Sequence, residues 1–216
     1  MPKFPEPPSV AELRRIGPEI FGLKAGSPLA RVFFRGGAWP VSWDEFRFWG
    51  PGQSRFDHHL PDAAGQPALG SRGIFYAAGS APPGALAVCL AEVFQETRII
   101  DSSDREPWFA VFRITRHLDL LDLRGLWPTR AGASAAISTG AKARARRWSR
   151  AIYEAWPDLD GIIYPSSMGG NADAFALYEK ATDALPAAPD FHRPLSDPAL
   201  TAPLLSAASA LNYALM

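Results

Sequence analysis

Apolar residues gather in short runs along the chain, separated by turns rich in glycine and proline. Runs with the length and composition typical of strands lie at 29–34, 74–76, 108–115, 118–123, 162–164 and 173–178. Longer apolar or amphipathic stretches predict helices at 85–94, 140–156 and 198–215. A capping box that begins at Ser9 predicts a further short helix, which ends near Gly17.

The predicted apolar helix 85–94 contains one acid, Glu92. The residues around Glu92, from Leu90 to Phe94, are otherwise apolar. Burying an unpaired charge costs free energy, so the carboxylate of Glu92 is not expected to be buried without compensation. Either Glu92 reaches solvent at the edge of the helix, or it faces a cleft where a negative charge is useful.

The composition narrows the class of protein. A chain of 216 residues, 47% of them apolar, fits one domain with possible extensions. The 22 basic and 22 acidic residues balance, which argues against a general binder of nucleic acid or of anionic membranes. The single cysteine, Cys89, excludes an intramolecular disulfide. The N-terminus lacks the apolar core of a secretion signal, and no stretch is apolar enough to span a bilayer, so we expect a cytoplasmic protein.

Two arginines and a tyrosine join Glu92 as candidates for a ligand site. The glycine-bearing loop Gly50–Asp57 leads into Arg55, and such a loop lets the backbone approach a ligand while the guanidinium holds a phosphate. The alternative is an ordinary turn with a surface arginine. Arg31 lies on the predicted strand 29–34, and Tyr76 ends the predicted strand 74–76.

Ser166 stands where the short strand 162–164 becomes a loop, a common place for a functional side chain. A serine there more often caps the backbone. The helix 140–156 carries a second stripe, of Lys142, Arg146 and Arg150. We interpret this stripe as a solvated face, with a partner or an anionic ligand as the alternative.

Familiar catalytic motifs are missing from the sequence. The chain has no G-x-G-x-x-G, no P-loop, no H-E-x-x-H and no G-x-S-x-G. The adjacent histidines, His58 and His59, have no Cys or His cluster beside them, so we expect no metal site. Asp119 and Asp122 are expected to lie on opposite faces of one strand and not to form a catalytic pair.

Five segments, taken in order, resemble the RES domain family, which is named for its Arg, Glu and Ser. They are LARVF at 29–33, GPGQSRFD at 50–57, GIFYAA at 73–78, ALAVCLAEVF at 85–94 and DGIIYPSS at 160–167. The resemblance runs from about Arg31 to Tyr178. It implies an N-terminal arm and short helix at 1–28, a catalytic domain at 29–180 and a C-terminal packing extension at 181–216. A Pro-Pro-Gly insertion at 82–84 departs from the family pattern and leaves the register to Glu92 open.

The family implies an α/β (α+β) fold similar to ADP-ribosyltransferase toxins, with small mixed sheets flanked by helices. It implies NAD as a substrate, with no prosthetic group, and cleavage of the nicotinamide–ribose bond by hydrolysis or phosphorolysis. Phosphate is therefore a possible second reactant. Many members are bacterial toxins that a helix-turn-helix antitoxin neutralises by covering the active site.

The resemblance implies a role for each candidate residue. Glu92 would stabilise the positive charge that develops on the ribose, or hold the ribose hydroxyls. Tyr76 would stack on the nicotinamide ring. Arg55, and Arg31 with it, would hold the diphosphate or a ribose. Ser166 would bind the nicotinamide ribose or orient Glu92, and Asn171 would lie at the rim of the pocket.

Two other functions stay open at this point. One is transfer of ADP-ribose to a protein, since surface loops choose the acceptor. The other is a binding or regulatory domain whose catalytic site has decayed. The presence of all the candidate polar residues favours an enzyme.

Overall fold

The computed structural model describes residues 4–48, 54–64, 66, 69–81 and 84–216. Two sequence predictions fall outside these ranges: most of the glycine loop, at 50–53, and the two prolines of the turn at 82–84. Within the described ranges, no helix has the length and apolar character that crossing a membrane requires.

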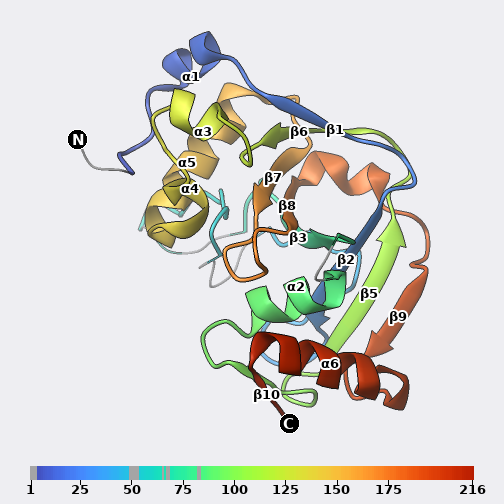
Figure 1. Cartoon of the computed structure of the whole chain (residues 1–216). Coiled ribbons are helices and arrows are strands. Elements are labelled where there is room, and N and C mark those ends of the chain that lie inside the picture. The colour runs from blue at the N-terminus through green and yellow to red at the C-terminus, as the bar shows by residue number, and fades with distance from the viewer. Residues whose placement is uncertain (1–3, 49–53, 65, 67–68, 82–83) are drawn as a thin grey trace.

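A single mixed sheet of eight strands forms the centre of the described chain (Figure 1). Its spatial order is β1 (Ile20–Leu23), β6 (Leu118–Asp122), β7 (Gly161–Pro165), β8 (Asp173–Tyr178), β3 (Ile74–Gly79), β2 (Pro28–Phe34), β5 (Pro107–Arg113) and β9 (Phe191–Pro194). The pair β6–β7 is parallel and the other neighbours are antiparallel. A separate parallel pair joins β4 (Ile99–Ile100) to β10 (Ala214–Leu215).

Helices fill the connections between the strands. They are α1 (Val10–Ile16), α2 (Ala85–Val93), α3 (Trp127–Arg130), α4 (Ala136–Thr139), α5 (Lys142–Ala155) and α6 (Thr201–Leu211), with 3-10 helices η1 (Glu179–Ala184) and η2 (Pro198–Leu200). The predicted α/β fold is therefore confirmed, although its sheet is larger than the small sheets we expected.

Two groups of helices cover neighbouring halves of one face of the sheet. Over β7 and β8, α5 packs its buried Trp148 and Ile152 against the face that carries Ile162. Over β2 and β3, α2 packs on Ala30, Val32 and Ala78. Residues two apart on a strand share a face, and the register from Tyr164 through Ala174 and Ala78 to Ala30 is continuous, so both groups lie on the same face.

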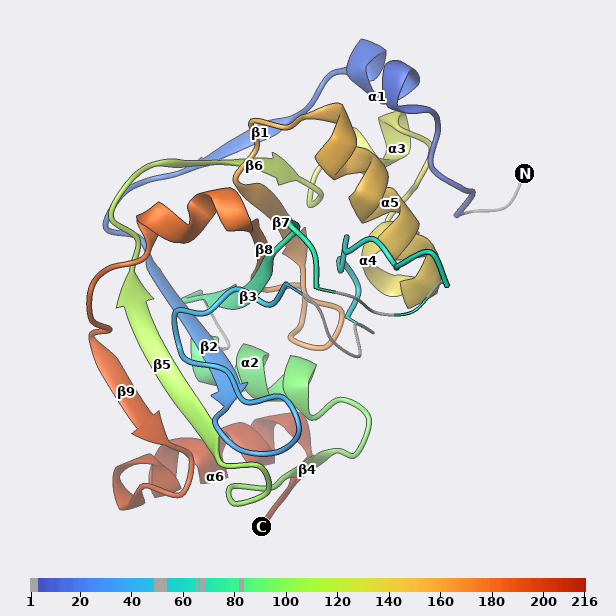
Figure 2. The ribbon, with the colours of Figure 1, turned by 180° about the vertical axis from the view of Figure 1, so that it is seen from behind.

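The opposite face is covered by the irregular 41–48 segment and by η1. Phe33, Phe75 and Phe112 point there and pack against Trp43 and Phe46 of the 41–48 segment. Figure 2 shows this segment, in light blue, crossing in front of β2, with α2 and α6 behind the strands. A sheet buried on both faces explains why its central strands are nearly continuous apolar runs.

Helix α6 packs on the outer side of α2, so α2 lies between the sheet and the C-terminal helix (Figure 1). Leu204, Ala207 and Ala208 of α6 are buried there. Burial on two sides explains why α2 is apolar almost all round and not amphipathic. Its range, 85–93, agrees with the helix expected at 85–94.

His58, three residues after Arg55, is enclosed by aromatic rings. Its side chain is fully buried, with the ring centroids of Tyr153 and Tyr178 at 4.5 and 4.6 Å. Its Nε2 lies 3.8 Å from Glu179 Oε2, too far for a hydrogen bond, and neither ring nitrogen has a partner among the described residues. Burial lowers the pKa of His58 and Glu179 opposes that shift, so the protein environment favours the neutral imidazole.

Substituting His58→Phe should flatten the dependence of stability on pH. Because the pKa of His58 is lower in the folded chain, its contribution is complete above the unfolded pKa of about 6.5 and is lost as the pH falls below it. Urea unfolding at pH 7.5, 6.5 and 5.5 should show a smaller loss of unfolding free energy for His58→Phe than for the parent chain. The exposed His117→Gln change is the control, and equal slopes in all three proteins would contradict the prediction.

Candidate active site

The site is built around a hydrogen bond between the ends of α2 and β7. Glu92, half-buried in the last turn of α2, accepts it through Oε1 from Ser166 Oγ at 2.5 Å. Ser166 is fully buried and directly follows β7. Its Oγ also accepts hydrogen bonds from the backbone N–H of Gly169, at 2.8 Å, and of Met168, at 3.3 Å. With two donors on the oxygen, the one hydroxyl proton is directed at Glu92.

A tight turn brings Ser166 close to α2. The backbone N–H of Asn171 donates to the carbonyl of Ser166 at 3.0 Å, which closes the turn. A Cβ at Gly169 would lie 3.0 Å from Ser166 Oγ and 3.1 Å from both methyl groups of Val88 on α2. The turn can therefore approach the helix this closely because residue 169 has no side chain.

Arg55 reaches the same region from the loop after residue 53. Its Nη1 donates to the carbonyl of Gly140 at 2.6 Å, and its other N–H groups make no hydrogen bond with the described residues. Burial lowers the pKa of Arg55, whereas the negative charge of Glu92 raises it, so the two groups lie within electrostatic range. Next to Arg55, Phe56 is fully buried with its ring centroid 4.6 Å from that of Tyr164.

Tyr76 makes its hydrogen bonds with the loop that carries Arg55. Its hydroxyl donates to Asp57 Oδ1 at 3.0 Å and accepts from the backbone N–H of Phe56 at 3.0 Å. Burial raises the pKa of Tyr76, so the phenol stays protonated. The same Oδ1 of Asp57 accepts from Arg47 Nη2 at 2.5 Å. Asp57 and Arg47 are not among the predicted site residues, because their pairing appears only when the loop folds back on β3.

Arg31 has its hydrogen bonds elsewhere. Its Nη1 donates to the carbonyls of Trp43 and Glu45, at 3.3 and 3.1 Å, and its guanidinium lies 4.1 Å from the ring centroid of Phe75. Burial lowers its pKa to about 10. The structure therefore brings together Glu92, Ser166 and Arg55, with Tyr76 next to Arg55, but it does not bring Arg31 into hydrogen-bond contact with them. The role of Arg31 in binding a ligand stays a prediction.

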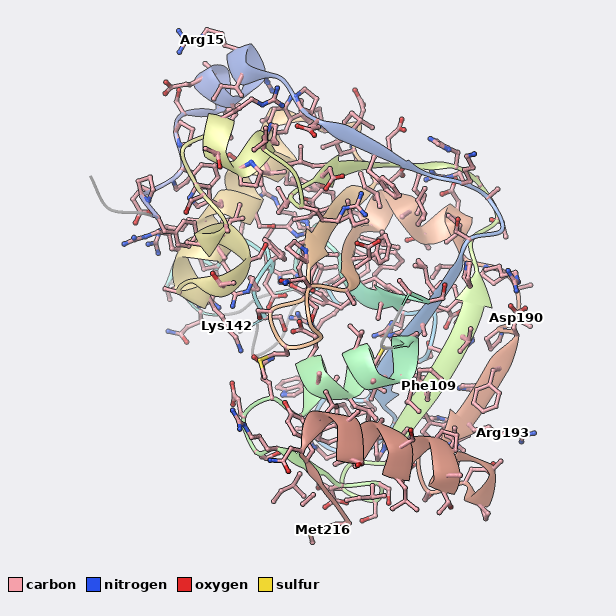
Figure 3. All side chains as sticks on the ribbon, viewed as in Figure 1. Arg15, Phe109, Lys142, Asp190, Arg193 and Met216 are labelled. Carbon is pink, nitrogen blue, oxygen red and sulfur yellow. The ribbon has the colours of Figure 1, made fainter. Side chains whose placement is uncertain are left out.

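Asn171 is exposed in the turn after Ser166 and has a φ of 65°, in the left-handed region that asparagine tolerates. The stripe on α5 is not fully solvated. Lys142 is 3.5 Å from Glu96, which follows α2, and Arg150 donates to the carbonyl of His59 at 3.0 Å. Figure 3 labels Lys142 on the side of α5 that faces the α2 region.

Other features of the described residues lie apart from this group. No three of their His, Cys, Asp and Glu side chains are placed to hold a metal ion. A surface hollow of about 450 Å³ is bounded by α1, β1 and the end of α5, with Arg14, Ile20 and Trp156 among its lining residues. Figure 1 places these elements at the far end of the molecule from α2. The hollow is therefore a separate feature from the Glu92 site.

A comparison with solved structures shows the same fold. The chain is similar to a chain in the crystal structure of the M. tuberculosis MbcT–MbcA toxin–antitoxin complex, with a TM-score of 0.55. The two are 15% identical, and the match covers 86% of this chain and 92% of the other. The chain therefore shares its overall α/β fold with a chain of that complex.

The search of curated proteins found no match. The family models give a clear result. The model of the RES domain matches residues 28–198, from the start of β2 to the start of η2. This segment contains all six of the candidate site residues, and the chain therefore belongs to the RES domain family.

Proposed function

We propose that the chain is an NAD-degrading enzyme that cleaves the nicotinamide–ribose bond by hydrolysis or phosphorolysis. The observation that carries the proposal is the carboxylate of Glu92, oriented by Ser166 and within electrostatic range of Arg55. Cleavage of this bond leaves positive charge on the ribose, and a fixed carboxylate stabilises that charge. Membership of the RES family, with its NAD-consuming toxins, supports the same reading.

Each polar group has a task in this proposal. Ser166 holds one oxygen of Glu92, and the other, Oε2, makes no hydrogen bond with the described residues and is left for the ribose. Arg55 retains donors for the diphosphate or a ribose hydroxyl. The ring of Tyr76 stacks on the nicotinamide. Ser166 is a positioning residue and not a nucleophile. Its hydroxyl donates to Glu92, which the proposal uses as a charged carboxylate, and no other described side chain accepts that proton.

We further propose that the enzyme is the toxin of a bacterial toxin–antitoxin pair, acting in the cytoplasm on the NAD pool. The fold likeness to a chain of a toxin–antitoxin complex supports this role. A helix-turn-helix antitoxin is the proposed partner, and no prosthetic group takes part. Forced expression in a bacterial host should arrest growth and deplete cellular NAD.

The direct test is to mix the purified chain with NAD, with and without inorganic phosphate, and to measure free nicotinamide. Hydrolysis gives ADP-ribose in both cases, and phosphorolysis requires phosphate and gives ADP-ribose 1″-phosphate. Label from NAD that stays on a protein would favour ADP-ribosyl transfer. If the parent chain at high concentration releases no more nicotinamide than the Glu92→Ala control, the proposal is wrong.

Substituting Glu92→Gln should lower kcat for nicotinamide release by about a hundredfold or more, because the neutral amide cannot stabilise the developing positive charge. The shape of the side chain is kept, so the melting temperature should change little. Glu96→Gln is the matched control, since Glu96 is a nearby exposed acid that pairs with Lys142. Similar rates for the two variants would contradict the role of Glu92.

Substituting Ser166→Ala should lower kcat by roughly tenfold and leave KM for NAD nearly unchanged. The variant loses a hydrogen bond to a carboxylate, of order 1.5–3 kcal/mol, but keeps the carboxylate itself. The residual activity should therefore exceed that of Glu92→Gln. If Ser166 were the nucleophile, Ser166→Ala would instead be the less active of the two, and steady-state kinetics distinguish these outcomes.

A further inference from the structure

We infer that Asp57 is a positioning residue for the reaction, because it fixes the backbone on both sides of Arg55. The effect on NAD binding rests on the proposed NAD cleavage. The fixed backbone at Arg55 rests on the contacts of Asp57 alone. Asp57 is not among the residues that either the sequence or the family name suggests.

The carboxylate of Asp57 is almost fully buried, at 2% exposure, and both of its oxygens are in use. Oδ1 accepts from the Tyr76 hydroxyl at 3.0 Å and from Arg47 Nη2 at 2.5 Å. Oδ2 accepts from the backbone N–H of Ser54 at 3.1 Å. Three different parts of the chain therefore meet on one side chain: β3, the 41–48 segment and the loop that carries Arg55.

These contacts hold both neighbours of Arg55. Ser54, on one side, is bound directly by Asp57. Phe56, on the other side, donates its N–H to the Tyr76 hydroxyl, whose own proton goes to Asp57. The carbonyl of Phe56 accepts from Ser149 Oγ of α5 at 2.7 Å. The backbone at Arg55 is thus fixed before any ligand arrives, which reduces the entropy that binding must remove.

A carboxylate is the side chain that this arrangement needs. The carboxylate of Asp57 accepts from three donors, and an ionised carboxylate has only acceptors. Its buried charge is neutralised by Arg47. Asparagine would replace one of the two oxygens by an NH2 group. In one orientation of the amide this group faces the N–H of Ser54, and in the other it faces the donors of Tyr76 and Arg47. The loop would then lose one of its attachments without loss of volume.

The test compares Asp57→Asn with Asp190→Asn, a control at an exposed aspartate that pairs with Arg113 (Figure 3 labels Asp190). Asp57→Asn should raise KM for NAD about tenfold and keep kcat within about twofold, as expected for a loss of preorganised binding. A loss of folded protein alone would lower the apparent kcat and leave KM unchanged. Asp190→Asn should change neither constant.

Two further measurements make the test specific to Arg55. In an Arg55→Ala background, Asp57→Asn should raise KM by less than about twofold, because the residue that it positions is gone. Hydrogen–deuterium exchange of the peptide 54–60 should accelerate about tenfold in Asp57→Asn and not in Asp190→Asn. An unchanged KM, or a full tenfold effect in the Arg55→Ala background, would overturn the inference.

The exchange measurement also separates this inference from the proposed function. If the parent chain releases no nicotinamide, the proposed function fails. The positioning role of Asp57 is judged separately, and unaltered exchange of the peptide 54–60 in Asp57→Asn would overturn it. If Asp57→Asn does not fold, Tyr76→Phe removes only the hydroxyl link and keeps the Asp57–Arg47 ion pair. Faster exchange of 54–60 in Tyr76→Phe supports the inference, and parent-like exchange there refutes it.

Discussion

The hydrogen bond between Ser166 and Glu92 joins two parts of the chain that are 74 residues apart and belong to different layers of the fold. Ser166 ends a central strand of the sheet, and Glu92 ends a helix that packs on the sheet from outside. This hydrogen bond can form only if α2 is held at a fixed distance from the sheet. The apolar contacts of α2 with β2 on one side and with α6 on the other provide that constraint.

The position of the site follows from how the sheet is covered. Two helix groups share one face, one over β7 and β8 and the other over β2 and β3. Glu92 comes from the second group, and Arg55 binds the turn before α5, in the first group. Polar residues collect at the boundary, where neither apolar core is complete. The neutral phenol of Tyr76 and the buried pair of Asp57 and Arg47 extend this polar region into the loop.

Much of this arrangement could be predicted from the sequence because the central elements have strong local signals. The strands 29–34 and 173–178 are nearly continuous apolar runs, and Glu92 stood out by its apolar neighbours. The edge strands β1 and β9 were missed, since each is four residues long and only partly buried. Asp57 was missed for a different reason. Its partners come from β3 and the 41–48 segment, and nothing in local spacing reports such a contact.

Gly169 and Val88 show how closely the turn after β7 fits against α2. The contact has two sides, so the space that a methyl group at residue 169 would take from Val88 can be restored by removing methyl groups at residue 88, whereas the close approach to Ser166 Oγ would remain. In a genetic selection, a defect from alanine at position 169 would therefore be suppressed in part by alanine or glycine at position 88. Across natural relatives, the same contact would appear as covariation between these two positions, although neither side chain bears a group that takes part in the chemistry.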